Sequence, residues 1–509
     1  MVCGGYLALV VDLLMDVFWF WVTGGQAHWF LRQEPEPLWV SALGCYLTCL
    51  WLFGVILGLY FVYLRLVCVK IRNMKKVLLV GNSPLPGAAT ISRPAAGLRT
   101  YQFKEALERA GFEVFLVCIA MPECYEVEPE TEVSEAGMVI SKNDLRLVER
   151  IREAAVEFGP EAIVGVNTFP SYVASRLGLK VPFWADLNGW IMAEGQAQAY
   201  KSESNAFLGH YFEMERAVLE RADKISCVSR AQGHAILGEL AFLGRLNKES
   251  FGYNFVEWVP NGTEDFDKGA AEIVLPEGFL LLWMGGYNTW VDEITLFKGI
   301  EKAMERCSEL KFVSTGGAIK GLDKGTFKNF YDLVEASPFK ERFVFLGWVD
   351  SETIPYIYRR AQAGINVDRM CVETLTGARN RINEMMKFGL PVITTLGSEI
   401  SYEVARVEAG LGVSSGDFEG LEKAIERIYS EWKEQDLKFV EYGRNGRRYI
   451  EEFCNYEVTV APLVSWLGGP SFAQGERVDF ARAKFSAAVK YLKDRGLKQF
   501  LRKLWQKIR

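Results

Sequence analysis

Residues 366–395 read NVDRMCVETLTGARNRINEMMKFGLPVITT, and no other part of the chain is as informative. It predicts an irregular loop that carries Glu373 and Gly377, followed by a helix. Gly389-Leu390-Pro391 then ends the helix and starts a buried strand at 392–395. A helix that leads directly into an apolar strand is typical of an α/β fold with a parallel sheet.

The predicted helix has the features of an anion site. It begins soon after Gly377, and the free amides and the dipole at a helix N-terminus favour negative charge. Arg379 and Arg381, on either side of Asn380, add charged donors, but residues two apart diverge on a helix, so at least one is expected to be structural. Glu384 follows about two turns into the helix and can accept bonds from hydroxyl groups. Phosphate and hydroxyl recognition together fit a nucleotide sugar. The alternative is an ordinary helix-to-strand connection.

This segment resembles the donor-binding segment of the retaining GT-B glycosyltransferases of family 4. The family pattern is Glu, seven residues, Glu, and a helix that ends in Gly-Leu-Pro-Val. Glu384 matches the second Glu, which the family uses on the donor ribose, whereas Thr376 stands at the position of the first. Glu373, three positions earlier, is the candidate for contact with the transferred sugar.

Length and charge describe a multidomain protein with an uneven charge distribution. The 509 residues are enough for two or three domains, and 50% of them are hydrophobic. The net charge is −6, yet residues 477–509 carry eleven Lys and Arg against two Asp. An acidic body with a basic tail predicts an anionic surface as partner and argues against a nucleic acid.

The cysteine and histidine content argues against a metal site. The ten cysteines lack CxxC spacing, and the chain has three His. The thiols are therefore expected to be reduced and mostly buried. The sequence has no credible Asp-x-Asp motif, so neither a metal nor another cofactor is expected beyond the sugar nucleotide, which is a substrate.

The N-terminal segment predicts a membrane anchor. Residues 39–64 contain no charge and as a helix would be about 39 Å long, enough for a hydrocarbon core of about 30 Å with tilt. Basic residues follow at 65–76 and place that end, with the catalytic domains, on the cytoplasmic side. The earlier run at 6–24 contains Asp12 and Asp16 and is either a second span or an interfacial helix. A helical hairpin is expected.

Beyond Lys76 the sequence alternates between strands and helices. A strand at 77–80, a Gly- and Pro-rich loop at 81–97 and a helix at 101–110 open a Rossmann-like half. A GxGxxG motif is missing from the sequence, which argues against a dinucleotide site. The resemblance implies that Gly97, in this loop, faces the donor phosphates and the acceptor.

Candidates for the acceptor side follow a predicted strand at 181–186. Asp186 and Asn188 stand where many relatives have a His or an acidic residue near the transferred sugar. Asp186 is either an acceptor-side base or hydroxyl ligand, or a structural cap of the strand end. Val-Pro-Asn-Gly at 259–262 resembles the family's end of the first domain.

A second Gly-rich loop opens the next Rossmann-like half. The family loop carries an Arg and then a Lys-Gly pair, which clamp the diphosphate. Here Asn288, Thr289 and Trp290 occupy the place of the Arg. Lys298 either keeps the Lys function or is a solvated helix residue. Much of the phosphate binding is therefore assigned to the helix after Gly377.

Trp348 and Val349 follow a further predicted strand of this half. The resemblance implies that the backbone of this loop reads the edge of the nucleobase. The Trp348 side chain either stacks on a ligand or plugs the domain.

The C-terminal tail reads as basic amphipathic helices. From 478 to 509, apolar residues recur at near-helical spacing among Lys and Arg, with a break near Gly496. Such helices are expected to lie on an anionic membrane leaflet, and the alternative is a helix packed on the acidic body.

The sequence therefore predicts a GT-B fold, with two Rossmann-like domains that face a cleft. The expected division is a membrane anchor at 1–74, an acceptor domain at 75–268, a donor domain at 269–446, a crossover segment at 447–475 and an amphipathic tail at 476–509. The expected activity is sugar transfer, with retention implied by the resemblance, from a nucleotide diphosphate sugar to a lipid-linked glycan or glycolipid. The alternatives are a catalytically inactive GT-B scaffold of a membrane glycan-assembly complex and a lipid-binding anchor protein without donor affinity.

Overall fold

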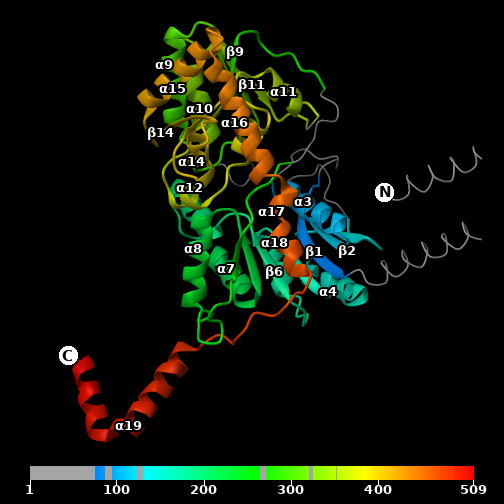
Figure 1. The fold of residues 1–509 in the computed structure, drawn as a ribbon, viewed down its shortest axis with the longest axis vertical. Helices are drawn as coiled ribbons and strands as arrows, with labels where there is room; N and C mark the ends of the chain where they lie inside the picture. Colours follow the sequence, from blue (N-terminus) through cyan, green and yellow to red (C-terminus); the bar gives the residue numbers. More distant parts are fainter. Residues whose placement is uncertain are drawn as a thin grey trace, which may run out of the picture. The chain divides into compact units, whose positions relative to one another are not determined.

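The computed structural model describes residues 75–85, 95–122, 130–263, 271–319, 325–350 and 352–508 (Figure 1). The chain divides into two compact units, residues 1–74 and residues 75–509, and the second is described below. The expected membrane segments at 6–24 and 39–64 lie outside the described residues. Within the described ranges, no helix combines the length and the apolar character needed to cross a membrane.

The first domain contains an eight-stranded sheet in the order β3-β4-β2-β1-β5-β6-β7-β8. All neighbouring strands are parallel except β3 and β4. The strands are β1 (Lys76–Ser83), β2 (Glu113–Ala120), β3 (Glu132–Ser134), β4 (Gly137–Ser141), β5 (Ala162–Val166), β6 (Phe183–Leu187), β7 (Lys224–Cys227) and β8 (Val256–Trp258). The helices are α3 (Ala95–Arg109), α4 (Leu147–Phe158), α5 (Thr168–Ser175), α6 (Ile191–Ser202), α7 (Leu208–Arg221) and α8 (Arg230–Phe242).

Strand β1 shows how the apolar sequence builds two cores. Leu78 and Val80 face the core on the side of α4, α5, α7 and α8, whereas Val77 and Leu79 face the core on the side of α3. Successive side chains of a strand point to opposite faces, so a continuous apolar run suits a sheet that is covered on both sides.

The β1–α3 loop is shorter than the sequence predicts. The expected loop at 81–97 is wrong at both ends, because β1 continues to Ser83 and α3 already begins at Ala95. Gly81 stays in the strand because the Thr100 side chain packs against it: a Cβ there would lie 2.2 Å from Thr100 Cγ2. The missing side chain thus allows close packing instead of a turn.

The second domain contains a six-stranded parallel sheet in the order β11-β10-β9-β12-β13-β14. Its strands are β9 (Phe279–Trp283), β10 (Leu310–Thr315), β11 (Phe343–Gly347), β12 (Ala363–Asn366), β13 (Val392–Thr395) and β14 (Gly410–Val413). Its helices are α9 (Glu293–Arg306), α10 (Thr326–Glu335), α11 (Ile354–Arg360), α12 (Val372–Thr376), α13 (Asn380–Lys387), α14 (Glu399–Arg406) and α15 (Phe418–Lys433). Two buried clusters again cover the two faces.

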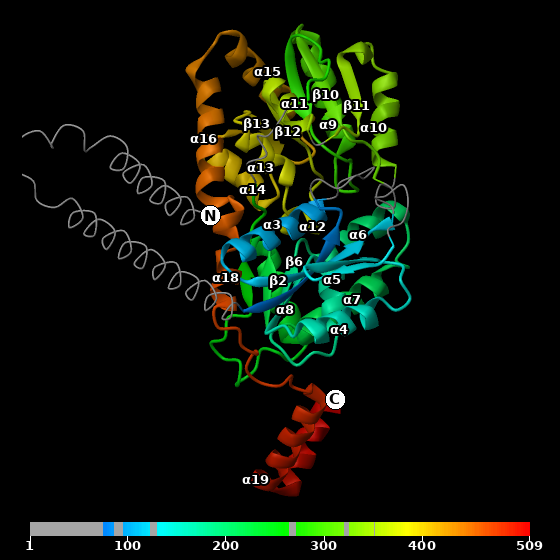
Figure 2. The same cartoon turned by 90° about the vertical axis from the view of Figure 1, so that its right-hand side faces the viewer.

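The chain returns to the first domain near its end. In α16 (Leu437–Phe453), Tyr449 and Ile450 still pack in the second domain. In α17 (Tyr456–Thr459) and α18 (Ala461–Leu467), buried residues join the core of β1 and α3. Figure 1 shows these two helices beside the first domain, Figure 2 shows α18 there as well, and α17 contacts α3. The two sheets, which are parallel except for the β3–β4 pair, and this crossing confirm the predicted GT-B type of α/β fold.

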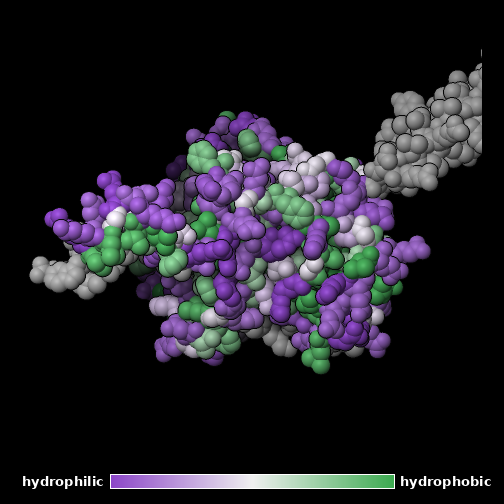
Figure 3. Space-filling model, turned by 90° about the horizontal axis from the view of Figure 1, so that it is seen from below, coloured by the Kyte–Doolittle hydropathy of each residue, from purple (hydrophilic) through white to green (hydrophobic). Residues whose placement is uncertain are grey.

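The tail forms one helical element, α19 (Phe480–Ile508), which is kinked at Gly496 (φ 77°, ψ 163°). The predicted helix and its break are therefore confirmed. Its start is attached to the first domain by the Arg477–Glu220 ion pair and by the bond from Val478 N to Gly244 O. Figure 3 shows hydrophobic side chains gathered along the helix beside hydrophilic ones. Phe485 and Leu497 are 71% and 62% exposed, so these apolar side chains do not pack on the body.

Candidate functional site

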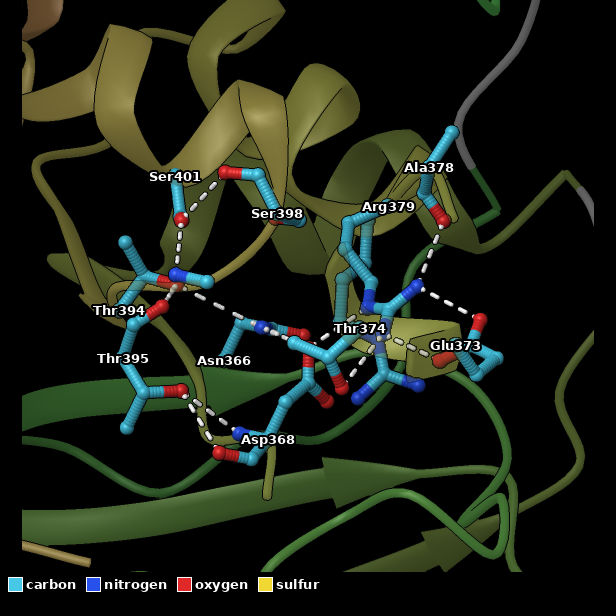
Figure 4. Close-up of polar contacts among 12 residues, drawn as sticks. Asn366, Asp368, Glu373, Thr374, Ala378, Arg379, Thr394, Thr395, Ser398 and Ser401 are labelled. Carbon is cyan, nitrogen blue, oxygen red and sulfur yellow. Dashed lines mark hydrogen bonds and ion pairs between the residues drawn. The ribbon is translucent and has the colours of Figure 1, made fainter. Parts of the chain in front are cut away.

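Arg379 is the centre of a buried ion triad at the carboxyl end of the second sheet (Figure 4). Its Nε donates to Asp368 Oδ2 at 2.6 Å, and Nη1 and Nη2 donate to the two Glu373 oxygens at 3.0 and 2.7 Å. Burial raises the pKa of Glu373, and the charge of Arg379 opposes that shift. All three guanidinium nitrogens of Arg379 have protein partners. Of Arg379 and Arg381, of which at least one was expected to be structural, Arg379 therefore has the structural role.

The loop that carries Asp368 is held by the neighbouring strand ends. Asp368 N donates to Thr395 Oγ1 at 2.7 Å, and Asn366 Nδ2 donates to Asp368 Oδ2 at 3.0 Å. Thr374 Oγ1 donates to Arg369 O at 2.7 Å. Because β12 and β13 are adjacent and parallel, their carboxyl ends fix this loop at one edge of the sheet.

Gly377 permits the tight turn between Glu373 and Arg379. A Cβ at Gly377 would lie 2.4 Å from Glu373 Oε1 and 2.8 Å from Arg379 Nη1. Asn380 begins α13 immediately after this turn. The glycine therefore serves the ion triad, a packing role that the sequence prediction of an anion site did not include.

Arg381 has the nitrogen that remains open to a ligand. Its Nη2 donates to Gly286 O at 2.7 Å, and its guanidinium lies 3.9 Å from the centre of the Trp283 ring. Its Nη1 is buried, and no residue of the described chain bonds to it. Burial lowers the pKa of Arg381 to about 10, so the group remains cationic at neutral pH.

The Gly-rich loop after β9 is held by hydrogen bonds of Tyr287. The Tyr287 hydroxyl is 2.8 Å from Ser314 Oγ, and Tyr287 N donates to Gly317 O at 3.0 Å. Asn288 is half-buried, while Thr289 is buried with an Oγ1 that has no hydrogen-bond partner among the described residues. The Trp290 ring lies 5.5 Å from the Arg379 guanidinium. Trp290 thus supports the ion triad, and Thr289 offers a free hydroxyl.

Lys298 does not join this group. It is exposed on α9, and its Nζ lies 5.3 Å from the centre of the Phe418 ring at the start of α15. Lys298 is thus a solvated helix residue in this structure, and its phosphate contact stays a prediction. The long side chain follows the helix surface, as is usual for lysine.

Trp348 and Val349 follow β11 and differ in environment. Trp348 is 50% exposed, whereas Val349 packs against the second domain's core. Trp348 does not plug the domain, so the stacking alternative remains for its ring.

Glu384 is half-buried on α13. Burial raises the pKa of Glu384, and Lys387 opposes the shift. No hydrogen bond or ion pair links its carboxylate to another described residue, so it is open to a ligand. The neighbouring Asn383 instead donates through Nδ2 to Asn261 O of the first domain at 2.9 Å.

Asp186 is fully buried and saturated. Arg99 Nε and Nη2 donate to its two oxygens at 2.8 and 2.7 Å, and Ser226 Oγ donates at 2.6 Å. The prediction of Asp186 as an acceptor-side base is therefore wrong, and the structural alternative is right.

Gly97 has a packing role in this structure. Because it has no side chain, Pro84 O can approach closely: a Cβ at Gly97 would lie 1.9 Å from that oxygen.

Asn188 belongs to a row of amides along the first sheet's carboxyl edge. Its Nδ2 donates to Asn167 Oδ1 at 3.1 Å, and Asn167 Nδ2 donates to Asn82 Oδ1 at 3.1 Å. These residues lie at the ends of β6, β5 and β1. The row is not titratable, so it can orient hydroxyl groups but cannot act as a base at neutral pH.

Several bonds join the two domains at this edge. Ser229 Oγ donates to Thr376 O at 2.6 Å, and Lys201 Nζ lies 3.3 Å from Glu293 Oε1. A small crevice between the domains is lined by both Asn261 and Arg379. The boundary thus brings the ion triad within reach of groups from the first domain.

Three residues of this region were missed by sequence reasoning. Asp368 follows a predicted strand and could have been found by the rule that ligands bind at carboxyl ends. Arg99 gave no such signal, because its partners lie far along the chain. Glu194 gave none, because the charged groups around it come from other elements.

Comparison with known proteins agrees with this architecture. Residues 278–431 match the family model described as glycosyl transferases group 1. No curated protein matches the chain. Among solved structures, sucrose-phosphate synthase from Thermosynechococcus elongatus is 20% identical, with a TM-score of 0.57 over 78% of this chain and 100% of that one.

Two further structures are similar. Anabaena Alr3699/HepE in complex with UDP-glucose is 14% identical, with a TM-score of 0.53 over 77% of this chain and 99% of that one. The E. coli structure described as trehalose-6-phosphate bound with UDP-2-fluoro glucose is 11% identical, with a TM-score of 0.55 over 78% and 100%. These likenesses show a GT-B type of fold. The family match covers residues 278–431 and supports glycosyltransferase activity.

Proposed function

We propose that this glycosyltransferase moves a sugar from a UDP-sugar to a lipid-linked glycan or glycolipid at a membrane, with retention of configuration. The observation that carries the donor half is Arg381 Nη1, a buried cationic donor that no described residue bonds. An unpaired buried donor is costly, so a ligand anion at this place would be stabilising. We choose a UDP-sugar as the donor because the HepE structure contains UDP-glucose and the E. coli structure contains UDP-2-fluoro glucose.

The donor would lie along the carboxyl edge of the second sheet. Arg381 and the loop after β9 would hold the diphosphate, Glu384 would accept bonds from the ribose, and Trp348 would stack on the base. Arg381, which lies in α13, would take the role of the arginine that the family carries in the Gly-rich loop after β9. Its charge would stabilise the diphosphate as the bond to the anomeric carbon breaks.

The Glu373–Arg379–Asp368 triad would hold other site residues in place and would not contact the substrate itself. Its members bond to each other, so it keeps the turn before α13 in place for Glu384 and Arg381. Such preorganisation matters because small displacements of donors reduce the stabilisation of a transition state.

The membrane half of the proposal rests on the tail and on the sequence. The exposed apolar side of α19 and its basic residues fit an anionic leaflet. The charge-free run at 39–64 would hold the catalytic domains at the cytoplasmic face. An anchored enzyme meets lipid-linked acceptors at high local concentration.

Calorimetry with UDP, GDP and their sugars, followed by nucleotide-release assays, tests this proposal. We expect micromolar to millimolar UDP-sugar binding and turnover that increases with a lipid-linked acceptor. Binding without turnover under any condition would favour the inactive scaffold. Binding of vesicles without binding of any nucleotide would favour the anchor protein.

A further inference from the structure

The first sheet has an edge opposite to the candidate site, and the chain enters the domain there. Strand β1 begins at Lys76, shortly after the predicted anchor at 1–74, and its neighbours β2 and β5 run parallel to it. The amino ends of these strands therefore share one edge of the sheet, which we call the amino edge. Lys75 Nζ donates to Leu467 O at 3.4 Å, so the end of α18 lies at this edge as well.

The segment between α18 and α19 follows the amino edge. Ala473 N donates to Asp223 Oδ1 at 2.8 Å, and Asp223 directly precedes β7. Because β5, β6, β7 and β8 are parallel, α8 returns the chain to the amino edge before β8 begins. Asn247, in this connection from α8 to β8, donates through Nδ2 to Glu476 O at 2.9 Å. The tail thus leaves the domain at the same edge (Figure 1).

Apolar side chains are exposed along the amino edge. They are Phe242 at the end of α8, Leu246 and Phe251 in the connection to β8, and Phe472 beside Ala473. Phe242 and Phe251 are 89% and 93% exposed, although the connection is ordered by bonds such as that from Ser250 Oγ to Arg245 O at 2.7 Å. Figure 3, a view from below, shows hydrophobic side chains in several places on this side. Single exposed apolar residues are ordinary, but a group on one edge indicates a contact surface.

We propose that the amino edge, with Phe242, Phe251 and α19, is the face that this protein lays on an anionic membrane leaflet. This inference rests on the membrane half of the proposed function. Residues 477–509 carry eleven Lys and Arg against two Asp, so the tail attracts this edge to anionic lipid. The two phenylalanine rings then enter the boundary between headgroups and acyl chains, where large apolar side chains are stabilised.

This orientation decides between the two acceptor classes of the proposed function. Arg381 and Asn188 lie at the carboxyl edges of their sheets, at the other end of the strands. Strand β1 has eight residues, and at about 3.3 Å per residue its two ends are about 26 Å apart. The reactive hydroxyl must therefore stand well away from the leaflet. A lipid-linked glycan of several sugars reaches that far, whereas a glycolipid with a single sugar does not.

Photo-crosslinking tests the orientation. Phe242 or Phe251 is replaced by p-benzoylphenylalanine in the full-length protein, which is placed in vesicles of phosphatidylcholine and phosphatidylglycerol, and mass spectrometry detects lipid adducts. Both side chains are exposed, so the replacement leaves the core intact. The matched control is the same replacement at Phe207. Its ring is also exposed, but it follows the end of α6, where Lys201 pairs with Glu293 of the second domain.

We expect lipid adducts at Phe242 and Phe251 and none at Phe207. The yield should fall when phosphatidylglycerol is omitted, because the basic tail then has no anionic surface to bind. Adducts at Phe207 alone, adducts at all three positions, or none at any position would each overturn the orientation. Equal yields in the two kinds of vesicle would overturn the part assigned to the tail.

The acceptor class is tested with wild-type protein, UDP-glucose and two lipid-linked acceptors, one with several sugars and one with a single sugar. We expect turnover with the longer glycan and its loss with the single sugar. Equal turnover of both would overturn the inferred distance between the site and the leaflet. Lipid adducts at Phe242 and Phe251 without turnover of either acceptor would support the orientation and count against the proposed function.

Discussion

Arg99 in α3 and Asp186 at the end of β6 form a bidentate ion pair that is almost completely buried, with contacts of 2.8 and 2.7 Å. Arg99 also donates to Asn261 Oδ1 at 3.0 Å and to Val259 O at 2.8 Å. One guanidinium thus ties the first helix to β6 and to the last turn of the first domain. The Arg99–Asp186 pair therefore holds the carboxyl edge of the first sheet in place, but its own atoms are not available to a substrate.

Removal of one partner should be strongly destabilising. Asp186→Ala leaves the Arg99 charge buried and unpaired, which typically costs about 3–5 kcal/mol. We expect a correspondingly lower urea midpoint for unfolding. The double variant Arg99→Met/Asp186→Leu should recover much of the loss, because no charge stays buried. A single variant as stable as the wild type would show that the pair is not needed.

Arg381→Gln should weaken donor binding. A lost hydrogen bond to a charged group is worth about 1.5–3 kcal/mol, so the dissociation constant for UDP should increase roughly 10- to 100-fold. Calorimetry measures the effect. Lys302→Gln is the matched control, since this exposed lysine of α9 pairs with Glu305, and it should bind UDP normally. Equal affinities in the two variants would exclude Arg381 from the diphosphate site.

Glu384→Ala should reduce activity by at least about tenfold through a loss of ribose contact. The fold should be preserved, because the carboxylate has no partner among the described residues. Steady-state kinetics with a UDP-sugar give the change, and circular dichroism checks the fold. Glu419→Ala, an exposed residue in the first turn of α15, is the control. Wild-type kinetics in the Glu384 variant would remove this residue from the site.

The Glu194 carboxyl should also make stability depend on pH. Its pKa is raised to about 8 in the folded state, above the ordinary value for Glu of about 4.3. The unfolded state therefore binds fewer protons between these values, and stability must fall as pH increases from about 4.5 to about 8. Thermal unfolding of Glu194→Gln should show a smaller fall over this window. Parallel curves for the two proteins would mean that Glu194 ionises normally.

The sequence predicted the layers well and the roles of charged residues less well. The strands could be found because apolar runs such as 77–80 and 279–283 are unambiguous in a sheet covered on both faces. Asp186 could not be assigned, because its partner Arg99 lies 87 positions away and is identified by tertiary packing. Glu194 was missed for the same reason: its unusual environment is created by α12 of the other domain.

The tail should bind anionic vesicles through both charge and apolar contact. Each Lys or Arg near such a surface contributes about 1 kcal/mol, and the Debye length falls from about 10 Å at 0.1 M salt to about 3 Å at 1 M. Binding of the full-length protein in co-sedimentation should therefore weaken with salt, and deletion of 477–509 should reduce it. Leu497 and Leu501 are exposed on α19, so Leu497→Ser/Leu501→Ser should weaken binding at every salt concentration. Lys490→Gln/Lys493→Gln should instead reduce the salt dependence. If the double Leu variant binds like the wild type and salt has no effect, α19 is not a membrane contact, and its apolar face must meet another surface.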